Sequence, residues 1–154
     1  MPKQSAGILL FRRTVLGPEV LLVHPGGPFW TRRDDGAWTI PKGECQPGEE
    51  PQAAAMREFE EETGQRAQGA LIPLGSFRQS SAKTISVWAV EGTLDPAKLK
   101  SITFSMEWPP RSGRMQDFPE VDRAGWFTIH AAARKIHKGQ AAILRALVDR
   151  LGAA

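Results

Sequence analysis

The sequence predicts an α/β fold in which helices cover both faces of a mixed β-sheet. Apolar runs typical of strands occur before and after one central helix, and the chain ends in helical segments with an apolar face. A chain of 154 residues is long enough to bury a full core. We therefore expect residues 1–154 to form a single domain.

The first part of the chain carries the pattern of three strands. Residues 4–13 form an apolar run closed by two arginines, and residues 19–24 form a second run after a Gly-Pro turn. Residues 25–36 are rich in glycine, proline and charge, so we expect a loop. Residues 37–40 are predicted to form a short third strand.

A single helix is predicted over residues 51–63. Pro51 suits the first helical position, and Gly64 suits the left-handed residue just after the end. Met56 and Phe59 fall on one face of this helix, which can pack against a core.

The remaining elements follow from shorter patterns. Residues 70–79 and 84–91 alternate in polarity and are predicted to form a β-hairpin. Residues 92–119 are the least regular part, with a short helical turn expected near residues 95–100. A last strand is predicted at 125–129, followed by helices at 130–137 and 139–151, of which the second has apolar residues at helical spacing.

The central helix carries three acidic side chains on one face. Glu58, Glu61 and Glu62 are spaced i, i+3, i+4, and like charges at such positions destabilise an isolated helix. Arg57 is the only basic residue between Lys42 and Arg66, so the alternating charges of an ordinary solvated face are missing. Oxygen ligands alone favour a hard cation, Mg²⁺ or Mn²⁺, over zinc. A solvated acidic face remains the alternative.

The stretch from Gly43 to Gly64 resembles the sequence signature of the Nudix hydrolase family. The signature is Gly, five residues, Glu, seven residues, then Arg-Glu-apolar-any-Glu-Glu-any-Gly-apolar. The chain matches it at Gly43, Glu49, Arg57, Glu58, Phe59, Glu61, Glu62 and Gly64. It departs from the pattern at Gln65, where the family usually has an aliphatic residue, and this affects packing after the helix.

The resemblance implies an α/β/α sandwich with a mixed sheet and a hydrolase that cleaves a diphosphate linkage with Mg²⁺ or Mn²⁺. By resemblance, Glu58, Glu61 and Glu62 are catalytic and hold the metal, together with the backbone carbonyl of Lys42. The structural residues of the signature are expected to be Gly43, Glu49, Arg57 and Gly64, with an ion pair between Glu49 and Arg57.

Many family members use a further acid outside the signature as metal ligand or general base. Glu120 is our candidate for this catalytic role, because its spacing to Trp126 resembles the family pattern. Glu107 is the rival candidate, and a surface carboxylate is the alternative for both.

Four basic side chains and one aromatic side chain are candidates for substrate binding. Lysine and arginine both suit phosphate oxygens, lysine as a point charge and arginine through its planar fork. An indole in a loop can stack on a nucleobase, although packing in the core is the alternative. These predicted substrate-binding residues are Lys42, Lys83, Arg111, Arg114 and Trp30.

The IPKGE sequence that begins the signature resembles that of diadenosine-polyphosphate hydrolases. The chain also resembles bacterial proteins described as predicted NTP pyrophosphohydrolases, notably at WPPRSGR and FPEVDRAGWF. We therefore expect a Mg²⁺-dependent pyrophosphohydrolase acting on a nucleoside polyphosphate. The alternatives are a catalytically silent Nudix module that binds nucleotides, and an RNA 5′-end pyrophosphohydrolase.

Charge and composition restrict the partners and the compartment. The net charge of +3 suits a small polyanionic substrate but is too low to predict nucleic-acid binding. The single cysteine, Cys45, excludes an internal disulfide framework and fits a reducing compartment. No apolar run approaches membrane-spanning length and no signal-peptide pattern is present, so we expect a cytoplasmic protein that does not bind membranes.

Overall fold

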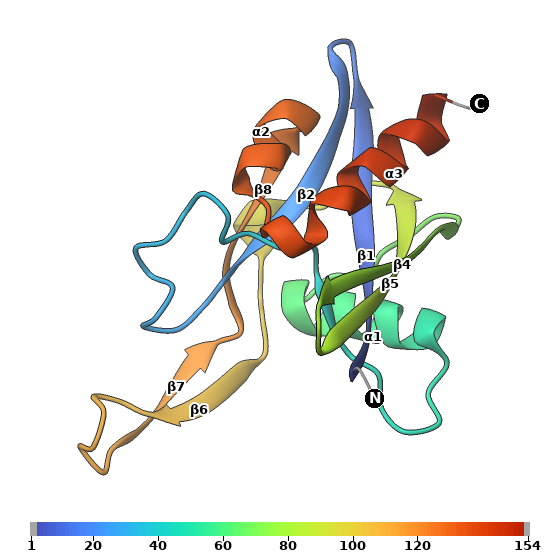
Figure 1. Cartoon of the computed structure of the whole chain (residues 1–154). Helices are drawn as coiled ribbons and strands as arrows, with labels where there is room; N and C mark the ends of the chain where they lie inside the picture. Colours follow the sequence, from blue (N-terminus) through green and yellow to red (C-terminus); the bar gives the residue numbers. More distant parts are fainter. Residues whose placement is uncertain (1–2, 153–154) are drawn as a thin grey trace.

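The structure is a computed structural model that describes residues 3–152. Eight strands, three α-helices and two 3₁₀ turns lie within these residues (Figure 1). The strands are β1 (Lys3–Thr14), β2 (Gly17–Pro25), β3 (Lys42–Glu44), β4 (Ile72–Ser80), β5 (Lys83–Glu91), β6 (Thr103–Glu107), β7 (Met115–Pro119) and β8 (Val121–Thr128). The helices are α1 (Pro51–Thr63), α2 (Ile129–Lys135) and α3 (Ala141–Gly152), and the turns are η1 (Pro96–Lys98) and η2 (Lys138–Gln140).

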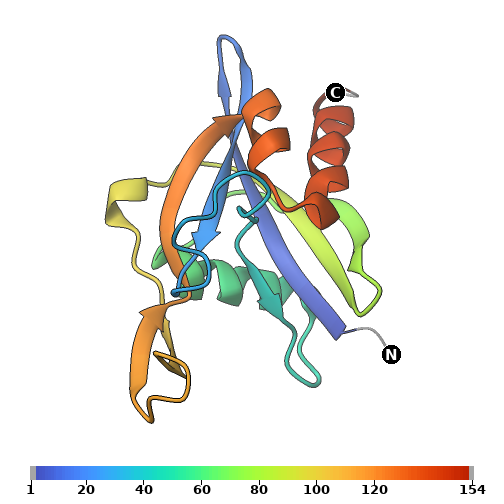
Figure 2. The same ribbon diagram turned by 60° about the vertical axis from the view of Figure 1, so that its left-hand side comes forward.

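The main sheet has six strands and is mixed, as the sequence predicts. Five strands follow the order β4-β5-β1-β2-β8, and β3 pairs with the start of β1. β1 and β5 run parallel, from Lys3 opposite Lys83 to Phe11 opposite Glu91, while the other pairs are antiparallel. β6 and β7 form a separate two-stranded arm that projects from the body (Figures 1 and 2).

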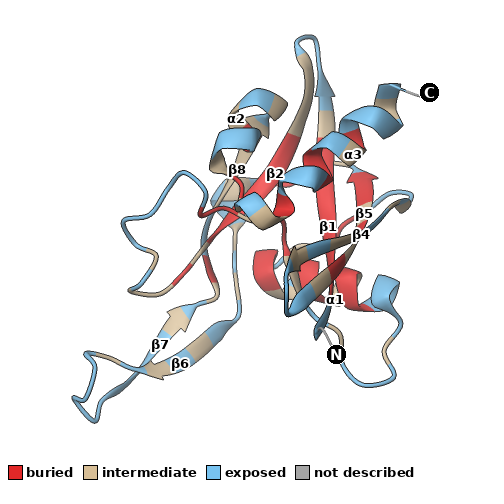
Figure 3. Ribbon diagram, viewed as in Figure 1, coloured by how far each residue is buried: buried red, intermediate tan, exposed pale blue. Residues whose placement is uncertain are grey.

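The sheet has a core on each face because side chains alternate along its central strand. Ile8 and Leu10 of β1 pack with Phe59 of α1, whereas Leu9 and Phe11 pack on the face that α2 and α3 cover. All five side chains are almost completely buried (Figure 3). The predicted α/β/α sandwich is therefore confirmed. Separately, no helix within residues 3–152 is long and apolar enough to cross a membrane.

The strand predicted at residues 37–40 is wrong in position. Thr39 forms a single bridge with Val23 of β2, through hydrogen bonds of 2.8 and 2.9 Å between their backbones. The regular strand is β3, which follows Pro41 and pairs with residues 5–7 of β1. A proline has no N–H to donate to a ladder, so pairing is interrupted there and resumes after it.

The segment predicted to be irregular, residues 92–119, contains the expected helical turn as η1 and also the arm of β6 and β7. The arm's side chains are exposed or half-buried, so its sequence lacks the apolar alternation of a strand on a core. Phe104 and Phe118 face each other across it, with ring centroids 6.0 Å apart.

The C-terminal elements are confirmed with shifted boundaries. β8 begins at Val121 rather than at residue 125, because its first residues pair with the end of β2. Thr128 ends the strand and caps α2, since its hydroxyl oxygen accepts a hydrogen bond from the N–H of Ala131.

Gln140 ties the C-terminal helices to the sheet. Its side chain is fully buried, and Oε1 accepts a hydrogen bond from the N–H of Ile40 at 3.0 Å. Its Nε2 donates to Oε1 of Gln79 on β4 at 3.2 Å. The buried amide of Gln140 thus supplies an acceptor for the backbone N–H of Ile40, just before β3, and a donor for the side chain of Gln79 on the edge strand β4.

We expect Gln140→Ala to lower the free energy of unfolding by about 1–3 kcal/mol, because the buried N–H of Ile40 loses its acceptor. Urea unfolding measures the change. Gln68→Ala, at an exposed position, is the matched control and should stay within about 0.5 kcal/mol of the wild type. Equal stability of the two variants would contradict the role of Gln140.

Candidate active site

α1 forms where the sequence predicts it. Pro51 lies at its start, and Gly64 ends it in the left-handed conformation (φ 76°), donating its N–H to the carbonyl of Glu60 at 2.7 Å. Ala54, Ala55 and Phe59 are fully buried against the sheet. The helix is therefore fixed on one side, and its acidic residues line the other sides.

Glu58 lies against the glycine that opens the signature. A Cβ placed on Gly43 would lie 2.0 Å from Cδ of Glu58, so only glycine leaves room for this carboxylate. Glu58 is nearly buried, and burial raises its pKa above the ordinary value, while Arg57 acts in the opposite direction. The close approach of β3 to α1 thus positions the first acid of the helix.

Glu62 is the most deeply buried acid of the helix face. Its Oε1 accepts a hydrogen bond from the N–H of Lys42 at 3.1 Å. Burial raises the pKa of Glu62 to about 8, with Lys42 lowering it and the charges of Glu58 and Glu120 raising it further. A carboxylate in this position is protonated near neutral pH unless a positive charge is added beside it.

Glu120, at the turn between β7 and β8, belongs to the same cluster. Burial and the charge of Glu61 raise the pKa of Glu120, and the charge of Glu120 in turn raises the pKa of Glu58 and Glu62. The sheet therefore brings Glu120 to the acids of α1 across about sixty residues of sequence. The rival Glu107 lies in the arm, where its carboxylate accepts the N–H groups of Arg111 and Gly113.

Arg57 links the acidic helix to the loop that precedes it. It forms a forked pair with Glu49, with distances of 2.9 Å from Nε and 3.0 Å from Nη2, and Nη2 also donates to the carbonyl of Glu44. Its Nη1 reaches Glu58 at 2.8 Å and Glu61 at 3.0 Å. The hydrogen bonds from Arg57 lower the pKa of Glu49 to about 2.

These acids could hold a hard divalent cation. Their donors are all oxygen, four carboxylates influence one another's charge, and Glu62 has only a backbone N–H as hydrogen-bond partner. Within residues 3–152, no three acidic, histidine or cysteine side chains already converge at metal-binding distances, and Arg57 lies between two of the acids. The chemistry of the donors fits a cation, and binding it requires the carboxylates to turn toward one another.

A cavity of about 270 Å³ adjoins the acids. It brings together three of the predicted substrate-binding residues, Trp30, Lys42 and Lys83, with Glu62 and Glu120. Its lining also includes Thr39, Gln79 and His137, which the sequence analysis did not select. The sequence offers no metal-ligand spacing around His137, and the packing of η2 on β4 helps to bring it to the cavity.

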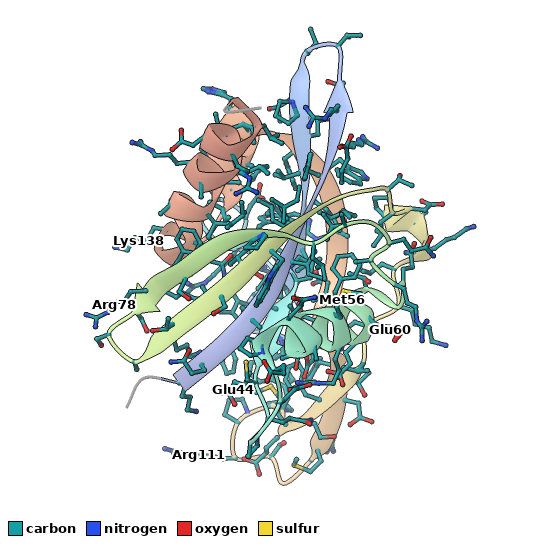
Figure 4. The ribbon with its side chains drawn as sticks, turned by 90° about the vertical axis from the view of Figure 1, so that its right-hand side faces the viewer. Glu44, Met56, Glu60, Arg78, Arg111 and Lys138 are labelled. Carbon is teal, nitrogen blue, oxygen red and sulfur yellow. The ribbon has the colours of Figure 1, made fainter. Side chains whose placement is uncertain are left out.

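Arg111 and Arg114 lie elsewhere. Both are exposed in the turn that joins β6 to β7, and neither lines the cavity. Figure 4 labels Arg111 well apart from Lys138, the first residue of η2 and the neighbour of the cavity residue His137. The structure thus leaves these two predicted contacts outside the cluster that it assembles.

His24 has a structural position. It is fully buried, with Nδ1 2.8 Å from Oδ1 of Asp122 and Nε2 2.6 Å from the carbonyl oxygen of Arg33. Each ring nitrogen of His24 thus lies within hydrogen-bond distance of an oxygen, one from Asp122 and one from the backbone of Arg33. His24 fixes the loop that carries Trp30 to the start of β8.

A mixed-sheet sandwich with this acidic helix between β3 and β4 defines the Nudix class of proteins. The family model described as the NUDIX domain matches residues 1–147. The chain belongs to the Nudix family.

Two curated relatives resemble parts of the chain. An RNA pyrophosphohydrolase of Erythrobacter litoralis is 42% identical over 66 residues, which cover 40% of this chain and 34% of that protein. An asymmetrical bis(5′-nucleosyl)-tetraphosphatase of Rattus norvegicus is 33% identical over 106 residues, covering 59% of this chain and 66% of that protein. The chain thus spans less than two thirds of the length of these relatives.

Solved structures share the fold at low identity. An Ap4A hydrolase of C. elegans in a binary complex superposes with a TM-score of 0.69 at 20% identity, over 97% of this chain and 99% of that chain. The NUDIX domain of Shewanella oneidensis NrtR, complexed with ADP ribose, gives a TM-score of 0.61 at 15% identity, over 98% and 89% of the two chains.

The ion pair between Glu49 and Arg57 predicts a pH-dependent contribution to stability. At pH 7, Glu49→Gln should lower the melting temperature, because the pair is fully formed above the ordinary pKa of 4.5. As the pH falls toward about 2, Glu49 takes up a proton and its contribution is lost, so the melting temperatures should converge. Thermal unfolding at pH 7, 5 and 3 measures this.

Glu50→Gln is the matched control, since Glu50 is an exposed neighbour in the same loop. It should melt like the wild type at each pH. A constant difference between Glu49→Gln and the wild type over the whole range would contradict the assignment of the pair.

Proposed function

We propose that the protein is a Mg²⁺- or Mn²⁺-dependent pyrophosphohydrolase that cleaves the diphosphate linkage of a nucleoside polyphosphate. The substrate class is a nucleoside triphosphate or a dinucleoside polyphosphate. The observation that carries this proposal is the cavity beside α1, in which acidic side chains meet two lysines. The proposed reaction requires acids that hold a cation and basic side chains that bind phosphate, and the lining of this cavity contains both.

In the proposed site, Glu58, Glu61 and Glu62 hold the cation, with the backbone carbonyl of Lys42. When bound, the cation neutralises phosphate oxygens and lowers the pKa of water. The raised pKa of Glu62 supports this role, because a buried acid whose charge Lys42 compensates only in part gains further from a divalent cation. The family's general use of divalent cations fits the oxygen-only donor set.

The protein's own groups then perform three tasks in hydrolysis. Water attacks one phosphorus, the bridging P–O bond breaks, and the released phosphate oxygen keeps the electron pair. Glu120 accepts the proton of that water, and burial and Glu61 bring its pKa closer to neutral than that of an exposed carboxylate. Lys42 and Lys83 bind the phosphates, and Trp30 stacks on the base. Arg111 and Arg114 remain predicted contacts for a substrate long enough to reach the arm.

The names of the relatives support a polyphosphate substrate. One is a tetraphosphatase and the other a pyrophosphohydrolase of RNA, and both names describe cleavage within a chain of phosphates. The partial match to the RNA enzyme makes 5′-triphosphorylated RNA the second candidate substrate. A nucleotide-binding module without activity is the alternative from another class, and the retained acids of α1 count against it.

Glu61→Gln should lower kcat by at least about 100-fold with ATP, diadenosine tetraphosphate or 5′-triphosphorylated RNA, because it removes a charge that holds the cation. Turnover of these substrates and of ADP-ribose is measured with Mg²⁺ and with Mn²⁺, and the products are identified. Glu60→Gln is the control on the neighbouring position of α1, where the side chain pairs with Arg66 (Figure 4).

Near-wild-type turnover of the Glu61→Gln variant would count against the metal assignment. A wild-type protein that binds these nucleotides and hydrolyses none of them would establish the silent module instead. Turnover confined to triphosphorylated RNA would establish the second candidate.

Gly43→Ala should lower activity far more than stability. The added Cβ displaces the carboxylate of Glu58, which is the end of a flexible side chain, so the fold can adjust while the acid leaves its position. We expect a loss of kcat of at least about tenfold, comparable to losing an outer contact of a metal site, with a small change in melting temperature. Gly152→Ala, where a Cβ has open space, is the matched control.

A further inference from the structure

Two side chains of the cavity have no place in the proposed metal chemistry. Gln79 lies near the end of β4, and His137 lies between α2 and η2. Both are half-buried, and both are held by hydrogen bonds from groups behind the cavity. These hydrogen bonds decide which polar atoms remain for a ligand.

The amide of Gln79 is oriented by a relay that starts at the backbone. The N–H of Ile40 can only donate, so the atom of Gln140 that it meets at 3.0 Å is the oxygen. Gln140 must then present its Nε2 to Gln79, where it donates to Oε1 at 3.2 Å. The acceptor of Gln79 is occupied, and its NH₂ group, a donor of two hydrogens, is left for the cavity.

The ring of His137 is oriented in the same way. The N–H of Gly139 donates to Nδ1 at 3.0 Å, so Nδ1 carries a lone pair and the ring proton is on Nε2. Burial and the positive charges of Lys42, Lys138 and Lys83 lower the pKa of His137 and keep the ring neutral. Gly139 permits this geometry, since a Cβ there would lie 2.3 Å from the carbonyl oxygen of Gln79.

The cavity therefore offers a set of donors outside its acids. The set consists of the ammonium groups of Lys42 and Lys83, the NH₂ of Gln79 and the Nε2–H of His137. The hydroxyl of Thr39, which donates to the carbonyl of Ile40, adds one neutral acceptor. A phosphoryl group has only acceptors and carries negative charge, so it satisfies the four donors of this set. A nucleobase also carries amino or ring N–H groups, so it satisfies a set of donors less completely than a phosphoryl group does.

We propose that Gln79 and His137, together with Lys83, form a subsite for a phosphoryl group beyond the diphosphate that the acids and their cation hold. This inference rests on the proposed function and narrows its substrate class. The site selects substrates with three or more phosphates in a row over diphosphates whose second phosphate is bonded to a sugar.

The test compares two nucleotides without a hydrolysable P–O–P bridge, α,β-methylene-ADP and α,β:β,γ-bismethylene-ATP, which differ by the terminal phosphoryl group and its methylene bridge. Calorimetry with Mg²⁺ gives the ratio of their dissociation constants. We expect the wild type to bind the triphosphate analogue at least about tenfold more tightly, since hydrogen bonds to a charged group of this strength correspond to about a factor of ten.

Gln79→Glu is the decisive variant, because it keeps the oxygen that accepts from Gln140 and replaces the NH₂ donor with a second, negatively charged oxygen. The ratio should fall toward one. Gln68→Glu makes the same change at an exposed position outside the cavity and should leave the ratio unchanged. His137→Leu should also reduce the ratio, whereas His137→Gln, which restores a donor, should recover part of it.

Melting temperatures establish that each variant is folded. The proposal is overturned by a wild-type ratio near one, or by equal ratios in Gln79→Glu and Gln68→Glu. It is also overturned if Gln79→Glu changes the preference between adenine and guanine analogues and leaves the phosphate ratio intact, because Gln79 then contacts the base and not a phosphoryl group.

The outcome is separable from that of the proposed function, since the binding ratio requires no turnover. A protein that shows the expected ratios and hydrolyses no polyphosphate would refute the hydrolase and retain the subsite. A hydrolase without the ratios would refute the subsite alone.

Discussion

The mutual repulsion of carboxylates at one end of the sheet is the constraint on which the rest of this structure depends. Glu58, Glu61 and Glu62 project from a helix whose opposite side is fixed in the core, and Glu120 joins them from the turn between β7 and β8. Burial raises the pKa of three of these four acids, so the arrangement is electrostatically incomplete without an added cation. Packing of α1 on the sheet supplies the free energy that keeps the charges together.

Arg57 limits this repulsion without removing it. The guanidinium pairs with Glu49 and also touches Glu58 and Glu61, so it ties the helix to the preceding loop and partly neutralises its acidic face. Glu62 lies beyond its reach and receives only the N–H of Lys42. This partial neutralisation by Arg57 has two consequences. A fully neutralised acidic face would have no need of a divalent cation, and an uncompensated face would destabilise the fold.

The cavity beside these acids combines groups that attract a cation with groups that attract an anion. The acids of its lining come from α1 and from the turn between β7 and β8. The lysines, an amide and an imidazole come from β3, β5, β4 and the residue before η2. Gln79, through Gln140, and His137 are oriented by the backbone N–H groups of Ile40 and Gly139, which makes the polarity of these two side chains a property of the fold. Side chains fixed in this way lose little conformational freedom when a ligand binds.

The sequence alone determined the features that depend on near neighbours in the chain. Pro51 and Gly64 mark the two ends of α1, and the spacing of the acids along this helix places them on one face. The apolar runs of β1 and β2 specify buried strands. Only the tertiary structure decided the exposed arm of β6 and β7, the position of β3 after Pro41, and the meeting of Glu120, Gln79 and His137. Each of these depends on pairing between distant segments, and a single polar residue carries no local pattern that reveals which distant group it will face.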